Sequence, residues 1–386
     1  MTDSIDITVL SRPLSRGRRS LLAAFAALAL LLSLTAASPA AAAPGMEVAV
    51  QDDAVLVGRL YYNRDRALEQ IRELGATRIR INLTWTEVLG RKQSSRRFQP
   101  KSIVYHWDKY DDAVYAARLH GMNVHMTITG PAPRWATRNK RIGVYRPDSG
   151  KYGAFTRSVA QHFLGRVDRY SIWNEPNYKG WLQPHNQSPK LYRGLFRAGW
   201  RAIKSVDPNA QVLIGETSPY AIKGRAMAPL RFLRGVTCTD RHWHRHCMGL
   251  KADGYAHHPY DFKHRPEFKY PGEDNVTVGT LPRLIRALVK LQRSGALRTQ
   301  YGQPLHIWLT EFGYFASGKY RIPTGRHAAY LRRGFQIARR TPRVHSMLQY
   351  LLVSPPKRWA YFNTSIVLRN GTPTAPYHAL RSFAGG

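Results

Sequence analysis

The chain has 386 residues, enough for one large barrel or two average domains. Apolar residues make up 43% of it and charged residues 22%, so a packed core is expected, and wholesale disorder and collagen are excluded. Two cysteines are too few for a disulfide-dense scaffold. The 59 lysines and arginines outnumber 24 aspartates and glutamates, and the formal net charge of +35 favours association with polyanions.

The N-terminus has the pattern of a bacterial export signal. A stretch with four arginines precedes an apolar run over 21–34, and small residues follow through 40–43. This order predicts a cleaved signal peptide over 1–43, and the pair Arg18-Arg19 also allows the twin-arginine route. The alternative is an uncleaved anchor, but the apolar run is short for a full span. We expect a secreted or cell-wall-associated protein whose mature chain has no transmembrane segment.

Export permits a disulfide, and Cys238 and Cys247 are the one available pair. Histidines and arginines lie between them. Their spacing matches no standard zinc pattern, and the arginines disfavour a bound cation. The sequence favours a basic surface loop closed by a disulfide. Free thiols are the alternative, and a metal site is the least favoured interpretation.

Strand-like and helical segments alternate along the rest of the chain. The predicted strands cover residues 47–57, 77–83, 124–129, 167–173, 212–215, 253–257, 305–310 and 344–353. The predicted helices cover residues 64–74, 110–119, 155–163, 191–206, 229–235, 281–293 and 326–339. A last amphipathic segment over 377–383 closes the series.

Such alternation is typical of a parallel sheet with crossover helices. Eight units predict a single-domain (β/α)8 TIM barrel, class α/β, over residues 44–386. An open doubly wound sheet is the alternative, but no glycine-rich phosphate loop follows the first strand. In a barrel, chemistry is carried at the carboxyl ends of the strands.

Two glutamates follow predicted strand ends. Glu175 comes after the fourth strand, in Asn174-Glu175-Pro176, and Glu311 comes after the seventh. In a closed barrel these two strand ends face each other across the mouth. A pair of carboxyl groups is the machinery of glycoside hydrolysis, in which one acts as a neutral acid and the other as an ionised carboxylate.

These residues make the chain resemble glycoside hydrolase clan A, the retaining (β/α)8 glycosidases, nearest to family 39-like and family 5-like members. The resemblance implies that Glu175 is the acid/base and Glu311 the nucleophile. Arg80, separated from Trp85 by four residues, matches the second-strand arginine that contacts the nucleophile in the clan. His258-Pro259-Tyr260 resembles the His-x-Tyr that follows the sixth strand, whose tyrosine bonds the nucleophile.

The remaining site candidates are polar or aromatic. Asn174 is expected to form a hydrogen bond with the sugar 2-hydroxyl, and His258 is also expected to bind the substrate. Trp85, Trp135 and Trp181 are candidate platforms for sugar rings, although each tryptophan on its own is as easily a packing residue. These assignments predict no metal and no organic cofactor.

Three features leave room for other interpretations. The third strand lacks the histidine of cellulase-type members, and the eighth ends in Gln349-Tyr350 where a tryptophan is common, with Trp359 farther along. Glu216, after the fifth strand, is a candidate for a secondary substrate contact.

A non-catalytic barrel that binds glycans or the cell wall is the alternative function. Binding to a specific nucleic acid is disfavoured, because the basic residues are spread along the chain without a reading motif. The positive charge is better explained by an acidic substrate or an anionic cell-wall polymer.

Overall fold

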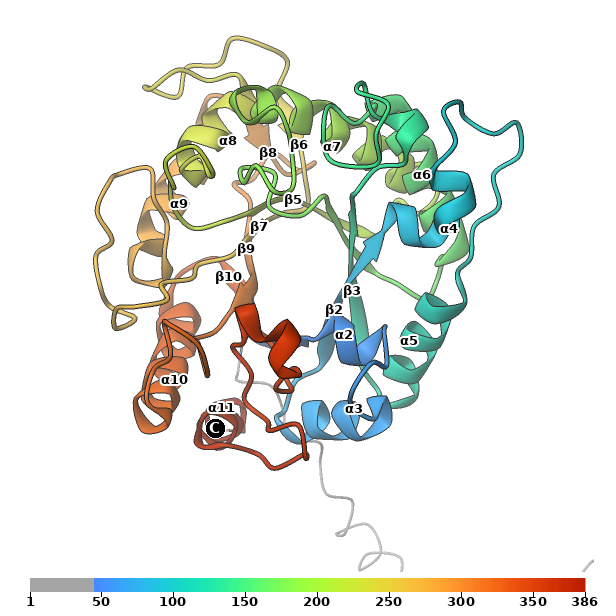
Figure 1. Ribbon diagram of the computed structural model, residues 1–386. Helices are drawn as coiled ribbons and strands as arrows, with labels where there is room; N and C mark the ends of the chain where they lie inside the picture. Colours follow the sequence, from blue (N-terminus) through green and yellow to red (C-terminus); the bar gives the residue numbers. More distant parts are fainter. Residues whose placement is uncertain (1–44, 386) are drawn as a thin grey trace, which may run out of the picture. The chain divides into compact units, whose positions relative to one another are not determined.

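The computed structural model describes residues 45–385 and contains a closed barrel of eight parallel strands. The order around the barrel is β1-β10-β9-β7-β5-β4-β3-β2 (Figure 1). Each barrel strand therefore pairs with the next barrel strand in the chain, and β10 pairs with β1 to close the barrel. The barrel strands are β1 (Glu47–Gln51), β2 (Arg78–Thr84), β3 (Asn123–Thr129), β4 (Arg169–Ile172), β5 (Gln211–Thr217), β7 (Gly254–His257), β9 (Ile307–Phe312) and β10 (Val344–Tyr350). The predicted TIM barrel is therefore confirmed.

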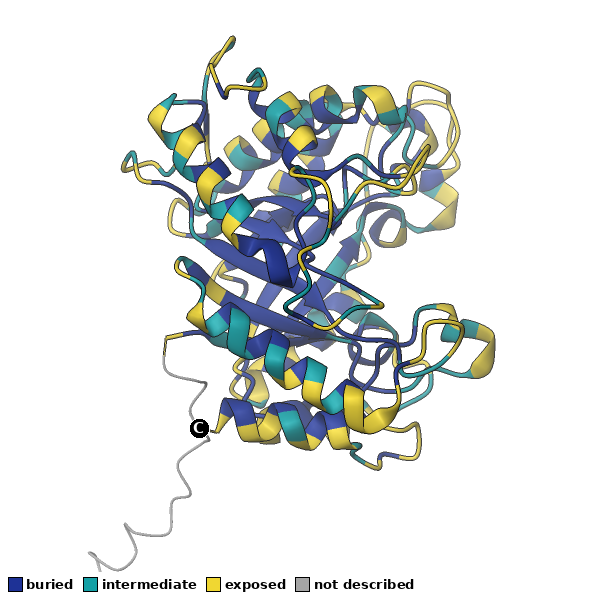
Figure 2. Ribbon diagram, turned by 90° about the vertical axis from the view of Figure 1, so that its left-hand side faces the viewer, coloured by how far each residue is buried: buried dark blue, intermediate teal, exposed yellow. Residues whose placement is uncertain are grey.

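Helices surround the strands on the outside of the barrel. They are α2 (Asp53–Leu56), α3 (Arg64–Glu73), α4 (Trp85–Ser94), α5 (Asp108–Leu119), α6 (Ser149–His162), α7 (Ser188–Lys204), α8 (Pro229–Thr237), α9 (Leu281–Arg293), α10 (Thr324–Arg340) and α11 (Ala375–Ala384). Their inner faces are apolar and buried, whereas exposed residues follow their outer faces (Figure 2). The strands are buried almost throughout because the helices cover one face and the barrel interior the other.

Two segments differ from the sequence-based prediction. The first strand ends at Gln51, because Asp52 caps the short helix α2 with its carboxylate. Helix α4 was not predicted: it is short, and Gly90 interrupts it with a φ of +70°. The last amphipathic segment, expected over 377–383, forms the helix α11.

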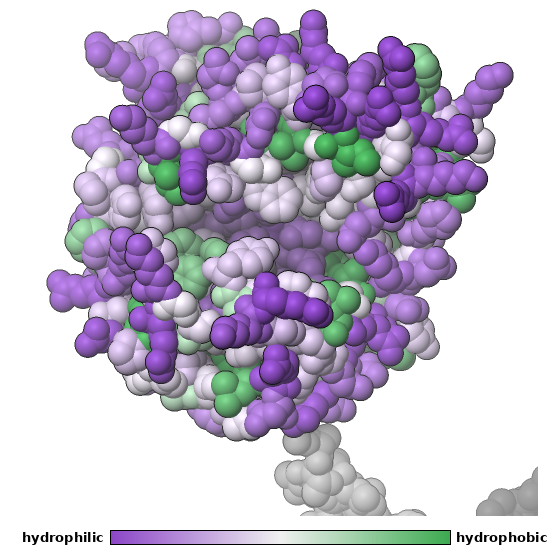
Figure 3. Space-filling model, viewed as in Figure 1, coloured by the Kyte–Doolittle hydropathy of each residue, from purple (hydrophilic) through white to green (hydrophobic). Residues whose placement is uncertain are grey.

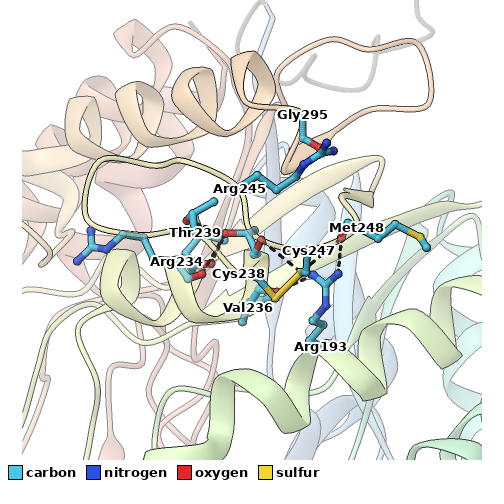
Figure 4. The surroundings of a disulfide bond; sticks show 11 residues. Arg193, Arg234, Val236, Cys238, Thr239, Arg245, Cys247, Met248 and Gly295 are labelled. Carbon is cyan, nitrogen blue, oxygen red and sulfur yellow. Dashed lines mark hydrogen bonds between the residues drawn. A yellow bond between two sulfur atoms is a disulfide. The ribbon is translucent and has the colours of Figure 1, made fainter.

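The predicted disulfide is present between Cys238 and Cys247, in the loop between α8 and the short strand β6 (Leu250–Lys251), which pairs with β8 (Leu297–Arg298). Figure 4 shows Arg193 of α7 donating to the carbonyls of Val236 and Met248 on either side of the loop, the former at 2.9 Å. The loop is thus fixed to the helix layer, away from the barrel mouth.

No helix within residues 45–385 is long and apolar enough to cross a membrane. The predicted signal peptide over 1–43 lies outside the described residues.

Candidate active site

A cavity of about 700 Å³ lies at the carboxyl ends of the barrel strands. The face seen in Figure 3 is hollowed at its centre, with hydrophilic side chains on the floor of the hollow and a mixture of pale, green and purple side chains around it. Glu311 stands near the end of β9, and Glu175 follows β4 by three residues. Both side chains line the cavity, together with Asn174. The two carboxylates predicted from the sequence are therefore brought together at one opening.

His258 contacts both carboxylates through one nitrogen atom. Its Nδ1 lies 3.1 Å from Oε1 of Glu175 and 3.6 Å from Oε2 of Glu311. Those two oxygens are therefore no more than about 6.7 Å apart, which admits the ~5–5.5 Å spacing of retaining glycosidases.

Arg80 lies behind the cavity and is fully buried. It donates from Nη1 to Oε1 of Glu311 at 2.7 Å and from Nη2 to Oδ1 of Asn174 at 2.9 Å. Burial opposes the charged guanidinium, but ion pairs with Glu216 and Glu311 outweigh it and raise the pKa of Arg80. A permanent positive charge is thus held directly beneath Glu311.

Tyr260 holds the other oxygen of Glu311. Its hydroxyl donates to Oε2 at 3.1 Å. Burial and the nearby carboxylate raise the pKa of Tyr260 well above its ordinary value, so the hydroxyl keeps its proton and remains a donor. Each oxygen of Glu311 therefore has a donor, which fixes the carboxylate in place.

Glu216 is the centre of this buried network, and the sequence did not reveal that role. Its Oε2 accepts from Nε2 of His258 at 2.7 Å, from Oγ1 of Thr310 at 2.7 Å and from Nη2 of Arg80 at 3.1 Å. Burial alone would raise its pKa, but Arg80 and His258 hold the pKa of Glu216 well below its ordinary value. The side chain of this candidate for a secondary substrate contact is fully buried and does not line the cavity.

The charge on His258 follows from the same network. Burial disfavours the imidazolium, but Glu311, Glu175 and Glu216 outweigh it and raise the pKa of His258 to about 10. Both ring nitrogens therefore carry protons and donate to Glu175 and Glu216. Arg80 contacts Glu311, as the resemblance implies. Arg80 and His258 are fully buried and do not line the cavity, so both hold the carboxylates from behind.

The backbone is left-handed at two of these positions. Glu175 has a φ of +36° and Glu216 a φ of +48°. Such conformations cost a non-glycine residue roughly 1–3 kcal/mol and persist where the surroundings enforce them, often at functional sites. Here the hydrogen bonds to His258 and Arg80 supply that constraint.

Two of the three candidate tryptophans are not in the site. Trp85 is fully buried at the start of α4, where its ring stacks on Phe155 with centroids 5.0 Å apart. Trp135 is 2% exposed and packs edge-on against Trp85. Neither lines the cavity, so the prediction that they bind sugar is wrong. Both follow strand ends, but the chain turns outward there and directs the rings into the helix layer.

The walls of the cavity are nevertheless aromatic. Trp181, a candidate platform from the sequence, lines it, and Tyr350 at the end of β10 and Trp359 in the following loop line it as well. Trp359 lies 5.9 Å from the ring of Tyr61, another lining residue. The eighth strand ends in Tyr350 instead of a tryptophan, and Trp359 and Tyr61 add two aromatic side chains to the wall. Further lining aromatic residues are Tyr178, Tyr220, Tyr260, Phe262, Tyr361 and Phe362.

A third carboxylate in the cavity, that of Asp53, was not predicted. It stands just after β1 and accepts from the backbone N–H of Asn82 at 2.7 Å and from Nε2 of Gln51 at 2.6 Å. Burial raises the pKa of Asp53 despite these donors. No sequence motif marks this carboxylate, because its position in the cavity depends on the hydrogen bond from Asn82 of β2.

The neighbouring Asp52 is fully buried, and its carboxylate accepts from the backbone N–H of Val353 at 3.0 Å and of Val55 at 3.4 Å. Burial, opposed by these donors and aided by the charge of Asp53, raises the pKa of Asp52 to about 7. Because folding raises this pKa above the ordinary 3.8, the stabilising contribution is complete below about pH 4 and is lost as the pH rises toward 7.

We therefore expect Asp52→Asn to change the pH dependence of stability. The free energy of unfolding of the variant, relative to the wild type, should increase by about 3 kcal/mol between about pH 4.5 and 7.5. Urea unfolding across this range measures it. The exposed Asp112→Asn is the matched control and should show no such trend. A pH-independent difference for Asp52→Asn would contradict the assignment.

Comparison with known proteins places this geometry in a family. A model described as Cellulase (glycosyl hydrolase family 5) matches residues 38–277, more than half of the chain, including Glu175 but not Glu311. A search of curated proteins gave no significant match.

Solved structures share the fold. A family 39 glycoside hydrolase from Bacteroides cellulosilyticus WH2 is 20% identical, with a TM-score of 0.65 over 88% of this chain and 63% of that one. A monomeric beta-xylosidase from Caulobacter crescentus CB15 is 18% identical, with a TM-score of 0.58 over 88% and 69%. A GH5_18 protein from Streptomyces cattleya, in complex with GlcNAc, is 13% identical, with a TM-score of 0.59 over 88% and 80%.

The chain thus spans less than two thirds of the length of the first of these structures. The family match agrees with the barrel and includes one of the two carboxylates at its mouth, Glu175. The chain belongs to the cellulase family, glycosyl hydrolase family 5, within the clan A glycosidases.

Proposed function

We propose that this protein is a retaining hydrolase of β-O-glycosidic bonds in an oligosaccharide, polysaccharide or glycoconjugate, with Glu311 as the nucleophile and Glu175 as the acid/base. The observation that carries the proposal is the contact of one His258 nitrogen with both carboxylates, while Arg80 and Tyr260 hold Glu311. This leaves Glu311 fixed and Glu175 free to use its second oxygen.

In the first step, a carboxylate oxygen of Glu311 forms a bond to the anomeric carbon as the glycosidic C–O bond breaks. The leaving oxygen takes the proton of Glu175, so the departing group leaves as a neutral alcohol. Arg80 and Tyr260 orient the attacking carboxylate, which is ionised before the bond forms. The amide Nδ2 of Asn174, whose Oδ1 is bonded to Arg80, is free to donate to the 2-hydroxyl.

In the second step, Glu175 is a carboxylate and acts as the base. It takes a proton from water, whose oxygen attacks the anomeric carbon and displaces Glu311. Two inversions at that carbon restore the original β configuration. Glu175 ends protonated and Glu311 ionised, so the enzyme is ready for another cycle. No metal or organic cofactor enters either step.

The aromatic walls favour a sugar substrate, since C–H faces of pyranose rings pack on aromatic faces while hydroxyls remain at the edges. Trp181 and the pair of Tyr61 and Trp359 stand on the cavity wall as such platforms. We further propose that the protein is exported, on the basis of the N-terminal pattern over 1–43 and of the disulfide, since disulfides persist in oxidising compartments.

The configuration of the first product tests the mechanism. A panel of aryl β-glycosides is screened for turnover, and the hydrolysis of the best substrate is followed by proton NMR before the anomers equilibrate. We expect the β anomer first. Initial release of the α anomer would mean a single displacement and would overturn the assignment of Glu311 as nucleophile.

A further inference from the structure

A second depression, separate from the catalytic cavity, has a cationic lining. It encloses about 530 Å³ between the end of α4 and the loop 131–148 that follows β3. Arg97, Arg134, Lys140 and Arg141 line it, and we call it the basic hollow. All four side chains belong to exposed residues.

The positive charge of the basic hollow is not neutralised by nearby residues. The two stretches that supply it, 88–107 and 113–147, contain no aspartate or glutamate. The ion pairs formed within 45–385 do not involve any of the four cations. Uncompensated charge of one sign in a concave site concentrates ligands of the opposite sign.

The loop that carries three of these cations is tied in place. Nε of Arg134 donates to the carbonyl of Lys140 at 2.8 Å, and Oγ1 of Thr137 donates to that of Arg141 at 2.6 Å. Backbone hydrogen bonds join Ala132 and Gly143 in both directions. The terminal nitrogens of the arginines remain free to bind, and a fixed loop reduces the entropy lost when they do so.

The same loop is joined to the wall of the catalytic cavity. The backbone N–H of Gln183 donates to the carbonyl of Val144 at 2.9 Å, and that of Arg146 donates back to Gln183 at 2.7 Å. Two residues before Gln183 stands Trp181, which lines the cavity. The loop that carries the basic hollow is therefore hydrogen-bonded to the segment that carries Trp181.

We propose that the basic hollow binds the acidic substituents of an anionic glycan whose scissile bond lies in the catalytic cavity. This inference rests on the proposed function, because it names the substrate class of that site. Arg225, the one lysine or arginine among the cavity-lining residues, extends the positive charge to the cavity itself. Single-stranded nucleic acid fits less well, since it needs aromatic surfaces for stacking and the described lining of the basic hollow has none.

The test compares two variants of equal charge. The hollow variant carries Arg97→Gln, Arg134→Gln, Lys140→Gln and Arg141→Gln. The control carries Arg286→Gln, Lys290→Gln, Arg293→Gln and Arg298→Gln, which replaces exposed residues on and after α9, on the other side of the barrel in Figure 1. Binding to immobilised alginate oligosaccharide, neutral cello-oligosaccharide and single-stranded DNA is measured by biolayer interferometry, with thermal melting as a check on folding.

We expect the hollow variant to bind alginate oligosaccharide about tenfold or more weakly, and the slope of log K against log salt between about 50 and 200 mM to fall by about 3, as for lost contacts to phosphates. The control should change far less. Equal losses in both variants would show an effect of net charge alone and overturn the proposal. A larger loss for DNA than for alginate would assign the basic hollow to nucleic acid, and an equal loss for the neutral oligosaccharide would show that acidity is not recognised.

Binding does not require turnover, so the same measurement in the Glu311→Gln background separates this inference from the catalytic proposal. Hydrolysis of a small neutral aryl β-glycoside, which is too short to reach the basic hollow, should be unchanged in the hollow variant. Retained anomeric configuration together with unchanged alginate binding would overturn the basic hollow and leave the retaining mechanism standing.

Discussion

Glu311→Gln should reduce kcat/KM on aryl β-glycosides by about a thousandfold or more, because an amide oxygen is too weak a nucleophile to form the glycosyl-enzyme. The change keeps the size of the side chain, and an amide oxygen still accepts from Arg80 or Tyr260. The fold should therefore persist, as circular dichroism would show. Glu273→Gln, an exposed carboxylate outside the cavity, is the matched control and should retain wild-type activity.

The proposed acid/base role of Glu175 is tested with a second variant. In Glu175→Ala, an activated aryl glycoside still forms the glycosyl-enzyme, because its leaving group needs no proton, but water lacks a base. Azide needs none: its nitrogen bonds to the anomeric carbon and displaces the Glu311 carboxylate. Turnover should rise with azide and yield the β-glycosyl azide. An α-azide, or azide rescue of Glu311→Gln in place of Glu175→Ala, would reverse or refute the two assignments.

Arg80→Met should be the most destabilising single substitution at the site. It removes the guanidinium from between Glu311 and Glu216, both largely or fully buried, and leaves Glu216 with reduced compensation. Breaking a buried pair in this way typically costs about 3–5 kcal/mol of unfolding free energy. Activity should also fall, since one oxygen of Glu311 loses its donor. Urea unfolding and kcat/KM measure the two effects.

Two further variants interpret the result. Arg157→Met removes an exposed arginine of α6 and should change stability by less than about 0.5 kcal/mol. Adding Glu216→Gln to Arg80→Met removes the buried charge left behind and should restore part of the lost stability, a coupling that a double-mutant cycle measures. Simple additivity of the two substitutions would mean that the Arg80–Glu216 pair is not the source of the loss.

The sequence alone predicted the barrel, because its signals are local. Apolar runs of strand length alternate with segments of helical period, and each reports burial of its own side chains. The strands came out within a few residues of their observed bounds, except the first, where Asp52 caps a helix. Helix α4 was not predicted because Gly90 divides it into two short pieces, each too short to show a helical period in the sequence.

Glu175 and Glu311 were also identified from the sequence, since each lies close to the carboxyl end of a strand and strand ends of a closed barrel converge on one mouth. The direction of other side chains could not be inferred in this way. Trp85 and Trp135 also follow strand ends, yet the path of the chain after β2 and β3 points them into the helix layer. Tyr61 and Trp359, which line the cavity, lie in the loops after β1 and β10 but farther from the strand ends than Trp85 and Trp135.

Glu216 shows most clearly what tertiary structure decided. Its role rests on His258 after β7, Thr310 on β9 and Arg80 on β2, three side chains that are distant in sequence and meet only because the barrel closes. A carboxylate at a strand end has the same sequence pattern whether it faces substrate or a buried cation. The sequence therefore determined the fold and the two carboxylates at the mouth, whereas barrel closure decided which neighbours hold them, because electrostatic networks depend on distances across the fold.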